Sequence, residues 1–375
     1  NHIRHILIIN YMPLRKDNLK IILFQLVILP FLFSCNSSSS SSSSTDSNSG
    51  SYFVKGGFGL FANGGNGVKY GNFELYLMGL IPPSEVEDIV YFDNVTQTTD
   101  DLNNRCSDGE WCPIFHSTSK KTLSITQLEQ NYGKRDPDSS QSQKSFNAMV
   151  MMISKTDLTQ SEIVDLSNDV NYFDNASENY GNFAWATGSR ASLTLDNLTN
   201  SLIDNSTTSY TYNNRDYKIL DNGSFVSVVI SDSEYSNWND GSINYISTFS
   251  NRTSFFEDVY KIFKDDFDFF IILHNNASLP STFSYYGLHM SVSSSIKGIS
   301  KTSTTYDYSS YYGSSGKLKF VIHIPYNGLL SGPTLHEIFH HWGNYILDSQ
   351  FTNQQSAGSH WGFSSACCQL GGFEK

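Results

Sequence analysis

Apolar runs along the chain predict where its strands lie. FNAMVMMIS at 146–154 and DFDFFIILHNN at 266–276 are typical of buried strands. SFVSVVISD at 224–232 and KLKFVIHIPY at 317–326 carry the β-branched or alternating pattern of a sheet. These four segments predict the strands of a mixed, twisted sheet.

Three segments show the patterns that begin and sustain helices. Thr159 and Glu162 have the spacing of a capping box, which predicts a helix to about Phe173. TSFFEDVYKIFKD at 253–265 places its apolar residues on one helical stripe. A third helix is expected to begin near Pro333 and to run to about residue 347.

The remaining segments predict less regular structure. FELYLMGLIPPSEV at 73–86 predicts a short apolar helical turn that ends at its two prolines. We expect loops and short strands at 91–141, a turn and a strand at 182–195, and an irregular linker at 200–222. The tyrosine-rich stretch 302–315 is expected to be a solvated loop.

The N-terminal segment has the pattern of an export signal. Arg15, Lys16 and Lys20 precede the apolar run 21–33, which is followed by a cysteine at Cys35. The run is too short to cross about 30 Å of hydrocarbon as a helix. LFSC resembles a bacterial lipobox, and this resemblance implies that Cys35 carries a lipid. An ordinary signal peptide, or a buried helix with an incidental cysteine, is the alternative.

These patterns divide the chain into four parts. We expect a signal peptide at 1–35, starting at Met12, and a Ser-rich disordered linker at 36–51. Two larger regions follow, at 52–200 and 201–375. The expected location is the bacterial outer membrane or cell surface, with the lipid anchor as the contact to the membrane.

Composition narrows the classes of partner. Of the 375 residues, 39% are hydrophobic and 14% aromatic, which is enough for a packed core, while only 16% are charged. The net charge of −12 argues against a nucleic acid partner, because phosphate binding needs a basic surface.

The other cysteines form two pairs in the sequence. Cys106 and Cys112, in CSDGEWC, can close a small loop by a disulfide in an oxidising compartment. Cys367 and Cys368 are adjacent, an arrangement that rarely gives two ligands to one metal. We interpret this second pair as structural or fortuitous.

The strongest chemical signal is HEIFH. A helix places His336 and His340 on one face, one turn apart, with Glu337 beside them. This is the HExxH spacing of a zinc peptidase, in which Zn²⁺ lowers the pKa of its water to roughly 7. We therefore expect Zn²⁺ at the two histidines and Glu337 as the base that activates the water. A helix with two surface or core histidines is the alternative.

HEIFHHWG resembles the front half of the metzincin signature, HExxHxxG. Gly343 occupies the position where that family turns sharply after the second histidine. The third histidine of the family would fall three residues later, where this chain has Ile346. The resemblance implies a zincin-like α+β fold with an active-site helix. It also implies that the strand at 317–326 is the edge strand that holds an extended substrate.

The third ligand must therefore come from another part of the chain. His360, in GSHWGFSS, is the candidate, and Asp348 and Glu74 are weaker ones. His341 should point about 100° away from His340 on the helix, as a supporting or structural residue. His274 and His323 are expected in the core or at its rim. His289 is expected in a loop, without a partner that the sequence identifies.

A second resemblance covers most of residues 52–375. HEIFHHWGN, HWGFSS, QLGGF, FANGGN and ELYLMGLIPPSEV look like consecutive blocks of a group of bacterial HExxH surface proteins. In that group the ELYLMGL block follows the HWG block, whereas here it precedes it, as in a circular permutant. Two partial copies of a longer array, or a misassembled reading frame, would give the same order. A permutation implies that Met78 lies beneath the metal, as in a metzincin Met-turn, and that 56–67 lies near 370–375.

These features predict a surface-anchored, zinc-dependent endopeptidase that acts on proteins or peptides. The alternative is a non-catalytic surface lipoprotein that binds protein or carbohydrate on a zincin-derived scaffold, through the loop at 302–315. A closed structural zinc site is a third class. It is disfavoured because the sequence offers no convincing fourth ligand, and an open position favours catalysis.

Overall fold

The computed structural model describes residues 50–53, 65–93, 95–96, 98–105, 107–109, 112, 114–174, 177–195, 198–244, 249–275, 287–299, 305–343, 360–361 and 364–372. All of them belong to one compact unit. The expected signal peptide with Met12 and Cys35 lies outside the described residues, as does most of the expected linker. Among the helices that are described, none has the length and apolar character needed to span a bilayer.

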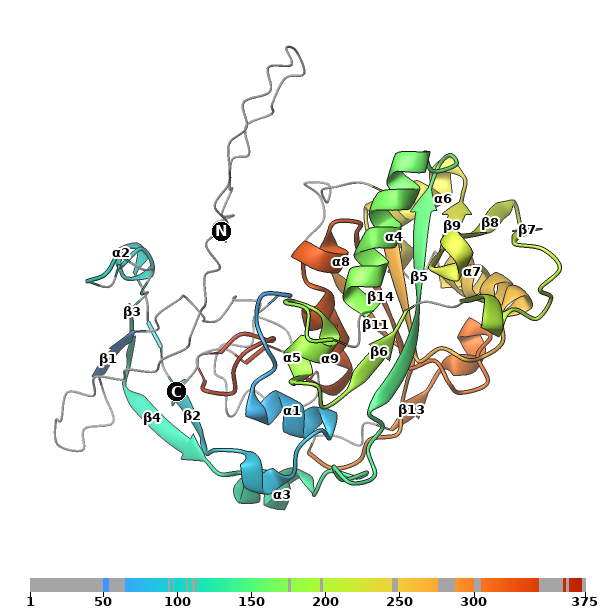
Figure 1. Cartoon of the computed structure of the whole chain (residues 1–375). Helices are drawn as coiled ribbons and strands as arrows, with labels where there is room; N and C mark the ends of the chain where they lie inside the picture. Colours follow the sequence, from blue (N-terminus) through green and yellow to red (C-terminus); the bar gives the residue numbers. More distant parts are fainter. Residues whose placement is uncertain are drawn as a thin grey trace, which may run out of the picture. The chain divides into compact units, whose positions relative to one another are not determined.

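The described residues fold around a mixed sheet, and the fold is α+β (Figure 1). β14, β10, β5 and β9 run parallel to one another, whereas β11 at one end and the β8–β7 hairpin at the other run antiparallel to their neighbours. In spatial order the strands are β11 (Leu288–Ser291), β14 (Phe320–Pro325), β10 (Phe269–His274), β5 (Ser145–Ser154), β9 (Phe225–Val229), β8 (Arg215–Leu220) and β7 (Ser209–Tyr212), with β6 (Ser192–Thr194) paired to β5.

The middle strands are apolar on both faces because both faces are covered. Ile271 of β10 lies opposite Val150 of β5 and Ile322 of β14, and all three side chains are fully buried. Continuous apolar runs are typical of such strands, which explains why the sequence revealed them. Every strand predicted from such a run is confirmed: 146–154, 224–232, 266–276 and 317–326.

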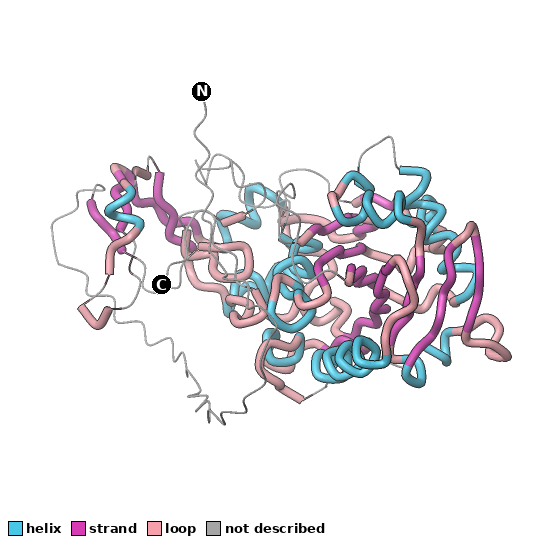
Figure 2. The backbone as a smooth tube through the Cα atoms, turned by 90° about the horizontal axis from the view of Figure 1, so that it is seen from above, coloured by secondary structure: helices cyan, strands magenta, loops and turns pink. Residues whose placement is uncertain are grey.

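Helices pack on both faces of the sheet, as Figures 1 and 2 show. One face is covered by α1 (Asn72–Met78), α4 (Gln160–Asp174), α5 (Phe183–Thr187), α8 (Gly328–Ser331) and α9 (Thr334–Gly343). The opposite face is covered by α6 (Asp232–Asn239) and α7 (Phe249–Ile262). The HEIFH helix, α9, therefore has an apolar core beneath it.

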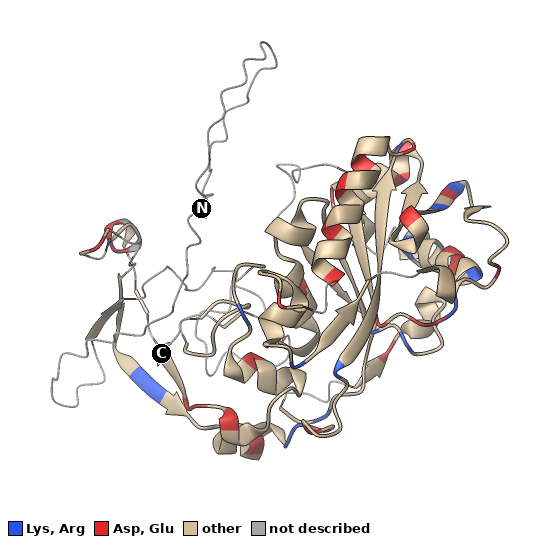
Figure 3. Ribbon diagram, viewed as in Figure 1, with Lys and Arg blue, Asp and Glu red and all other residues tan. Residues whose placement is uncertain are grey.

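α4 illustrates how the sequence sets one of these helices. The predicted capping box is confirmed, because the Thr159 N–H donates to Glu162 Oε2 at 2.7 Å and the Glu162 N–H donates to Thr159 Oγ1 at 3.3 Å. Acidic side chains colour the outer turns of α4 in Figure 3. Its apolar side packs into the core through three residues: Leu166, Val170 and Phe173.

Smaller elements surround the main sheet. Three strand pairs are β1 (Gly50–Phe53) with β3 (Ile114–Ser117), β2 (Ile89–Asp93) with β4 (Ser119–Leu123), and β12 (Ser293–Ser294) with β13 (Tyr306–Asp307). Short helices are η1 (Pro83–Glu85), α2 (Thr99–Leu102), α3 (Ile125–Tyr132), η2 (Leu198–Ser201), η3 (Asp221–Gly223), η4 (Ser242–Asn244) and η6 (Ser309–Tyr312).

Three predictions of local structure were wrong in part. The segment 91–141, expected to hold loops and short strands, also contains the helices α2 and α3. The segment 182–195 begins with the helix α5, capped by the Asn182 side chain, before the expected strand. The segment 200–222, expected to be an irregular linker, contains the β7–β8 hairpin. Asn213 and Asn214 have φ values of 50° and 61°, and asparagine is one of the residues that tolerate this left-handed region in a two-residue hairpin turn.

The regions expected on either side of residue 200 share one sheet. β5 precedes that boundary in sequence but lies between β9 and β10, which follow it. The expected edge strand is also corrected: the strand at 317–326 is β14, which has β10 on one side and β11 on the other. Because every residue of β14 is buried, it suits an interior position, and β11 forms the end of the sheet.

Candidate metal centre

The start of α9 is held by side chains from the N-terminal part of the described chain. Asn66 Oδ1 accepts from the Leu335 N–H at 3.0 Å, and Asn66 Nδ2 donates to the Leu329 carbonyl at 2.7 Å. The Tyr70 hydroxyl donates to the Leu335 carbonyl at 2.8 Å. Segments far apart in sequence therefore set the position of the HEIFH helix.

Three histidines meet at α9. The Nε2 atoms of His340 and His360 each lie 3.1 Å from His336 Nε2. One ring nitrogen of each residue lies within 4.8 Å of the others, so the group can hold a metal ion. Two nitrogens bound to one tetrahedral zinc at about 2.0–2.1 Å lie roughly 3.4 Å apart. The structure thus brings the three predicted ligands together at a spacing that fits a shared ion.

A backbone carbonyl orients the first of these histidines. His336 Nδ1 donates a hydrogen bond to the carbonyl of Gln369, so Nε2 keeps its lone pair for a ligand. Burial, and then the charges of His340 and His360, hold the pKa of His336 well below its usual range. His336 is therefore a neutral imidazole, the form that binds a metal.

Glu74 forms hydrogen bonds with the loop that follows the third histidine. Its Oε1 accepts from the Trp361 indole N–H at 2.9 Å and from the backbone N–H groups of Gln369 and Leu370 at 2.7 and 3.2 Å. Its Oε2 accepts from the Gly71 N–H at 3.1 Å. Burial raises the pKa of Glu74 to about 7, although these hydrogen bonds lower it. Glu74, a weaker ligand candidate in the sequence, thus positions the loop and does not belong to the histidine cluster.

The side chain of Gln369 joins the same loop to the Gly-rich segment. Its Nε2 donates to the carbonyl of Gly65 at 2.8 Å and to that of Val68 at 2.5 Å. Gly65, of the segment 56–67, thus lies beside Gln369, one residue before the range 370–375. The expected proximity of the two ranges themselves stays a prediction.

Glu337 is buried next to His336. It is 5% exposed, and no ion pair joins it to a cation among the described residues. Burial raises the pKa of Glu337 to about 8. The backbone of Gly287 lies against its side chain, since a Cβ at that position would be 2.6 Å from Glu337 Oε1. A side chain at Gly287 would displace the carboxylate, so glycine is required at this close approach.

His289 is a residue of the centre that sequence reasoning missed. It lies in β11, and its Nδ1 donates to the backbone carbonyl of Glu337 at 2.9 Å. Its ring centroid is 6.0 Å from that of His340. The four-residue strand LHMS is too short for its alternation to be recognised, so the sequence carried no signal that placed His289 beside α9.

The other predicted histidines lie away from the cluster. His341 packs its ring 5.2 Å from the ring of Phe320 and lines a separate cavity with Trp342. His274 and His323 are buried core residues, as expected, and their facing ring nitrogens are 2.9 Å apart.

Gly343 is the last residue of α9, and packing explains why it has no side chain. A Cβ there would lie 2.5 Å from Leu370 Cδ1 and 2.8 Å from Phe339 Cε1. The chain after Gly343, including Ile346 and Asp348, lies outside the described residues. The sharp turn implied by the metzincin resemblance therefore stays a prediction.

Met78 and the cysteines complete the set of predicted residues. Met78 is the buried last residue of α1 and lines a cavity next to the end of α9, but its place beneath a metal stays a prediction. Cys112 is buried and engaged in a disulfide, whereas Cys106 lies outside the described residues. Cys367 and Cys368 are joined to each other, which agrees with a structural pair.

Comparisons with known proteins identify no relative: no family model, no curated protein and no solved structure matches this chain. Its function must therefore be argued from the geometry of the centre.

Proposed function

We propose that this protein is a zinc-dependent endopeptidase whose metal is held by His336, His340 and His360. The observation that carries the proposal is the convergence of three histidine nitrogens beside the buried carboxylate of Glu337. Imidazole ligands suit zinc, and three protein ligands leave one tetrahedral position open, as catalytic zinc sites do.

Glu337 has the position expected of a general base. A bound zinc ion would supply Lewis acidity, polarising a substrate carbonyl and easing the deprotonation of water. Glu337 Oε1 would accept the proton of the attacking water and return it to the leaving amine. The raised pKa of Glu337, about 8, strengthens its carboxylate as a proton acceptor. A cation held beside it would bring that pKa down towards the working pH.

The end strand of the sheet gives an extended substrate a place to bind. Within the described residues β11 pairs only with β14, and we infer that a peptide strand would pair with its other side. Gly287 directly precedes β11 and lies against Glu337. A peptide aligned along this side of β11 would therefore pass the base.

The test combines zinc content with hydrolysis of casein by the wild type and the variant Glu337→Gln. Because this substitution leaves the three histidines intact, we expect zinc content to be unchanged. We expect hydrolysis to fall roughly 10²- to 10⁴-fold, the usual contribution of a general base. Glu257→Gln, at an exposed position of α7 on the opposite face, is the matched control and should retain activity.

Two results would contradict the proposal in different ways. Equal hydrolysis by the wild type and Glu337→Gln would remove Glu337 from the mechanism. A zinc-loaded wild type that cleaves no protein or peptide would favour a binding protein.

One observation favours that second function. Tyr308 and Tyr311 are 53% and 57% exposed, and their ring centroids lie 6.5 Å apart. Exposed aromatic rings of this kind bind protein or carbohydrate surfaces. The neighbouring Tyr312 is buried, so the segment is anchored and not merely solvated. Loss of glycan or protein capture in Tyr308→Ala with Tyr311→Ala, in a protein without peptidase activity, would support this alternative.

We also propose that a lipid on Cys35 holds the protein at the outer membrane or cell surface. The support is the basic, apolar and LFSC pattern that ends at Cys35. Cys35→Ala should abolish incorporation of labelled palmitate and release the protein from the membrane fraction. Unchanged labelling would contradict the proposal.

A further inference from the structure

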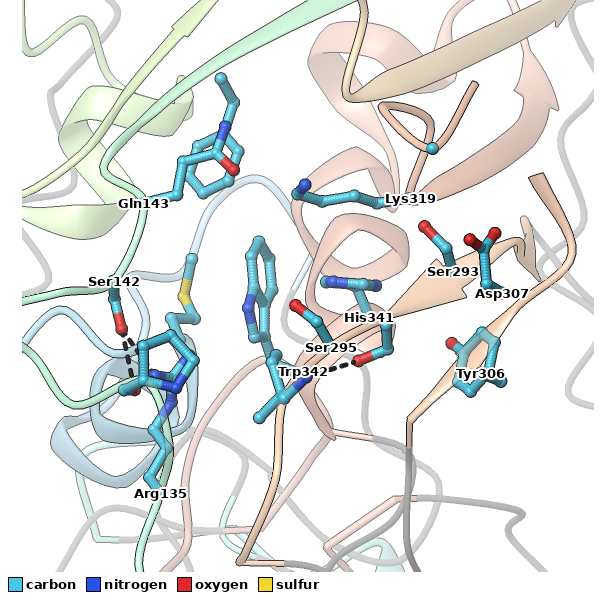
Figure 4. A pocket seen from close by; sticks show the side chains of 16 residues that line it. Arg135, Ser142, Gln143, Ser293, Ser295, Tyr306, Asp307, Lys319, His341 and Trp342 are labelled. Carbon is cyan, nitrogen blue, oxygen red and sulfur yellow. Dashed lines mark hydrogen bonds between the residues drawn. The ribbon is translucent and has the colours of Figure 1, made fainter. Parts of the chain in front are cut away.

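A second polar cavity lies at the C-terminal end of α9. Its volume is about 230 Å³, and its lining includes neither the three clustered histidines nor Glu337. Liquid water occupies about 30 Å³ per molecule, so the cavity has room for a small ligand. Figure 4 shows the side chains that matter here: Arg135, Ser142, Ser293, Asp307, Lys319, His341 and Trp342.

Arg135 is a buried cation that donates hydrogen bonds to neutral acceptors. It is 6% exposed. Among the described residues no carboxylate forms an ion pair with it, although the charges of Asp136 and Asp138 act on it from nearby. Its hydrogen bonds go to neutral acceptors: Nε donates to the Leu77 carbonyl at 2.7 Å, and one terminal nitrogen donates to Ser142 Oγ at 2.6 Å and to the Pro137 carbonyl. Burying a charge without a counter-charge is costly. An anion in the cavity would offset this cost.

Lys319 adds a second positive charge to the lining. Its Nζ lies 3.3 Å from Asp268 Oδ1, but the Nζ of Lys317 lies 3.2 Å from the same oxygen. One carboxylate thus serves two lysines, and one positive charge remains. Asp307 also lines the cavity, with Oδ1 accepting from the Ser309 N–H at 2.9 Å.

His341 supplies a polar atom that lacks a partner. The ring is buried, and Nδ1 makes no hydrogen bond within the part of the chain that is described. With the ring proton on this nitrogen, Nδ1 can donate to a bound anion. Ser293 and Ser295 add hydroxyl groups to the lining.

We propose that this cavity binds a small oxyanion, a carboxylate or phosphate group, between Arg135, Lys319 and His341. Arg135 would donate from its second terminal nitrogen, because Nε and the first terminal nitrogen already donate to the protein, and Lys319 acts as a second positive charge. Trp342 and Phe146 give the cavity an apolar wall against which a short organic body can pack. The site is distinct from the metal centre and does not depend on peptidase activity.

The test measures binding of inorganic phosphate and of acetate by calorimetry, at constant ionic strength set with chloride. We expect saturable binding of at least one of these anions. Arg135→Gln should weaken it by at least about tenfold, since a hydrogen bond to a charged group contributes about 1.5–3 kcal/mol. Lys319→Gln is the second variant, for use if Arg135→Gln does not fold. It should weaken binding several-fold. Lys218→Gln, on the distant strand β8, is the control and should bind as the wild type does.

Comparison of the two anions distinguishes the sources of the oxyanion. Tighter phosphate binding indicates a phosphate ligand, and tighter acetate binding indicates a carboxylate. Absence of saturable binding for both, or equal affinity in wild type and Lys319→Gln, would overturn the proposal. A crystal soaked in phosphate that shows the anion only at the histidine cluster would overturn it as well.

Discussion

Two buried polar clusters lie against opposite faces of the sheet, and they differ in charge balance. Under α6 and α7, Arg215 donates to Glu234 at 2.9 Å and to Asp258 at 2.8 Å, and each of these side chains is at most 13% exposed. Under α9, the nitrogens of three histidines face one another beside Glu337. In that second cluster, no cation of the described residues forms an ion pair with the carboxylate.

This difference in charge balance distinguishes a structural cluster from a ligand-binding site. The Arg215 cluster is complete within the protein, because positive and negative groups satisfy one another. In the form we propose, the histidine cluster presents electron pairs to a common point, where a cation would balance them. Burial of polar groups is common to both, so incomplete balance, and not burial, indicates where a ligand belongs.

Arg215→Met should produce the largest loss of stability. It leaves the buried carboxylate of Glu234 without a cation and Asp258 with Lys261 as its remaining cation, which costs about 3–5 kcal/mol of unfolding free energy. The measurement is denaturant unfolding, accompanied by a zinc-affinity titration against a chelator. Zinc affinity should stay as in the wild type. A large loss of zinc affinity in the folded variant would show that the two clusters are coupled and would break the comparison.

His336→Ala should lower the zinc affinity and change the stability of the metal-free protein little. Zinc sites with four ligands bind with about 10–16 kcal/mol, so one ligand contributes roughly 4 kcal/mol, or about a thousandfold in affinity. Stability of the metal-free protein should change much less than in Arg215→Met. Competition with a chelator measures the affinity. Retention of wild-type affinity would show that these histidines do not form the metal site.

Glu74→Gln tests the support of the centre through pH. The folded pKa of Glu74, about 7, lies above its ordinary value of 4.5, so between these values the folded state binds more protons than the unfolded state. Unfolding free energy of the metal-free wild type should therefore fall with rising pH over this window, by about 3 kcal/mol from this group.

The variant lacks this titration, so its stability should depend less on pH between 4.5 and 7. Its zinc affinity should also fall roughly 10-fold, as loss of an outer supporting contact does. Stability profiles with and without EDTA give both quantities. Parallel pH profiles for the two proteins would contradict the assignment of the raised pKa to Glu74.

Lys218→Gln should have the smallest effect. Lys218 and Asp157 form a surface ion pair with side chains 36% and 66% exposed, and such pairs contribute about 0–1 kcal/mol. We expect a change in unfolding free energy below about 0.5 kcal/mol. A change as large as that of Arg215→Met would remove the distinction between buried and exposed charge networks.

The sequence predicted the elements that carry the centre, but not the contacts that complete it. The i, i+4 spacing of His336 and His340 and the apolar runs of β5 and β10 are local signals, and the structure has these elements. His360 was selected as the remaining candidate after Ile346 broke the signature, and the structure places it beside the other two.

Other parts of the centre left no local signal. The carbonyl that orients His336 belongs to the backbone of Gln369. Because every residue type has a backbone carbonyl, the sequence does not indicate which one acts here. Glu74 acts through a hydrogen bond to a residue 287 positions away. β7 and β11 have four residues each, and SYTY and LHMS are too short to show a period.

The contact of Gln369 with Gly65 also affects when the centre forms during folding. It joins residues 304 positions apart, and closing so long a loop is entropically unfavourable until many other contacts exist. α9 alone carries two of the histidines, while the third, and the carbonyl that aligns the first, belong to segments that reach α9 only when a long loop closes. Uptake of metal would therefore report that the chain has completed its fold, and a folding intermediate with only the helix in place would release the ion.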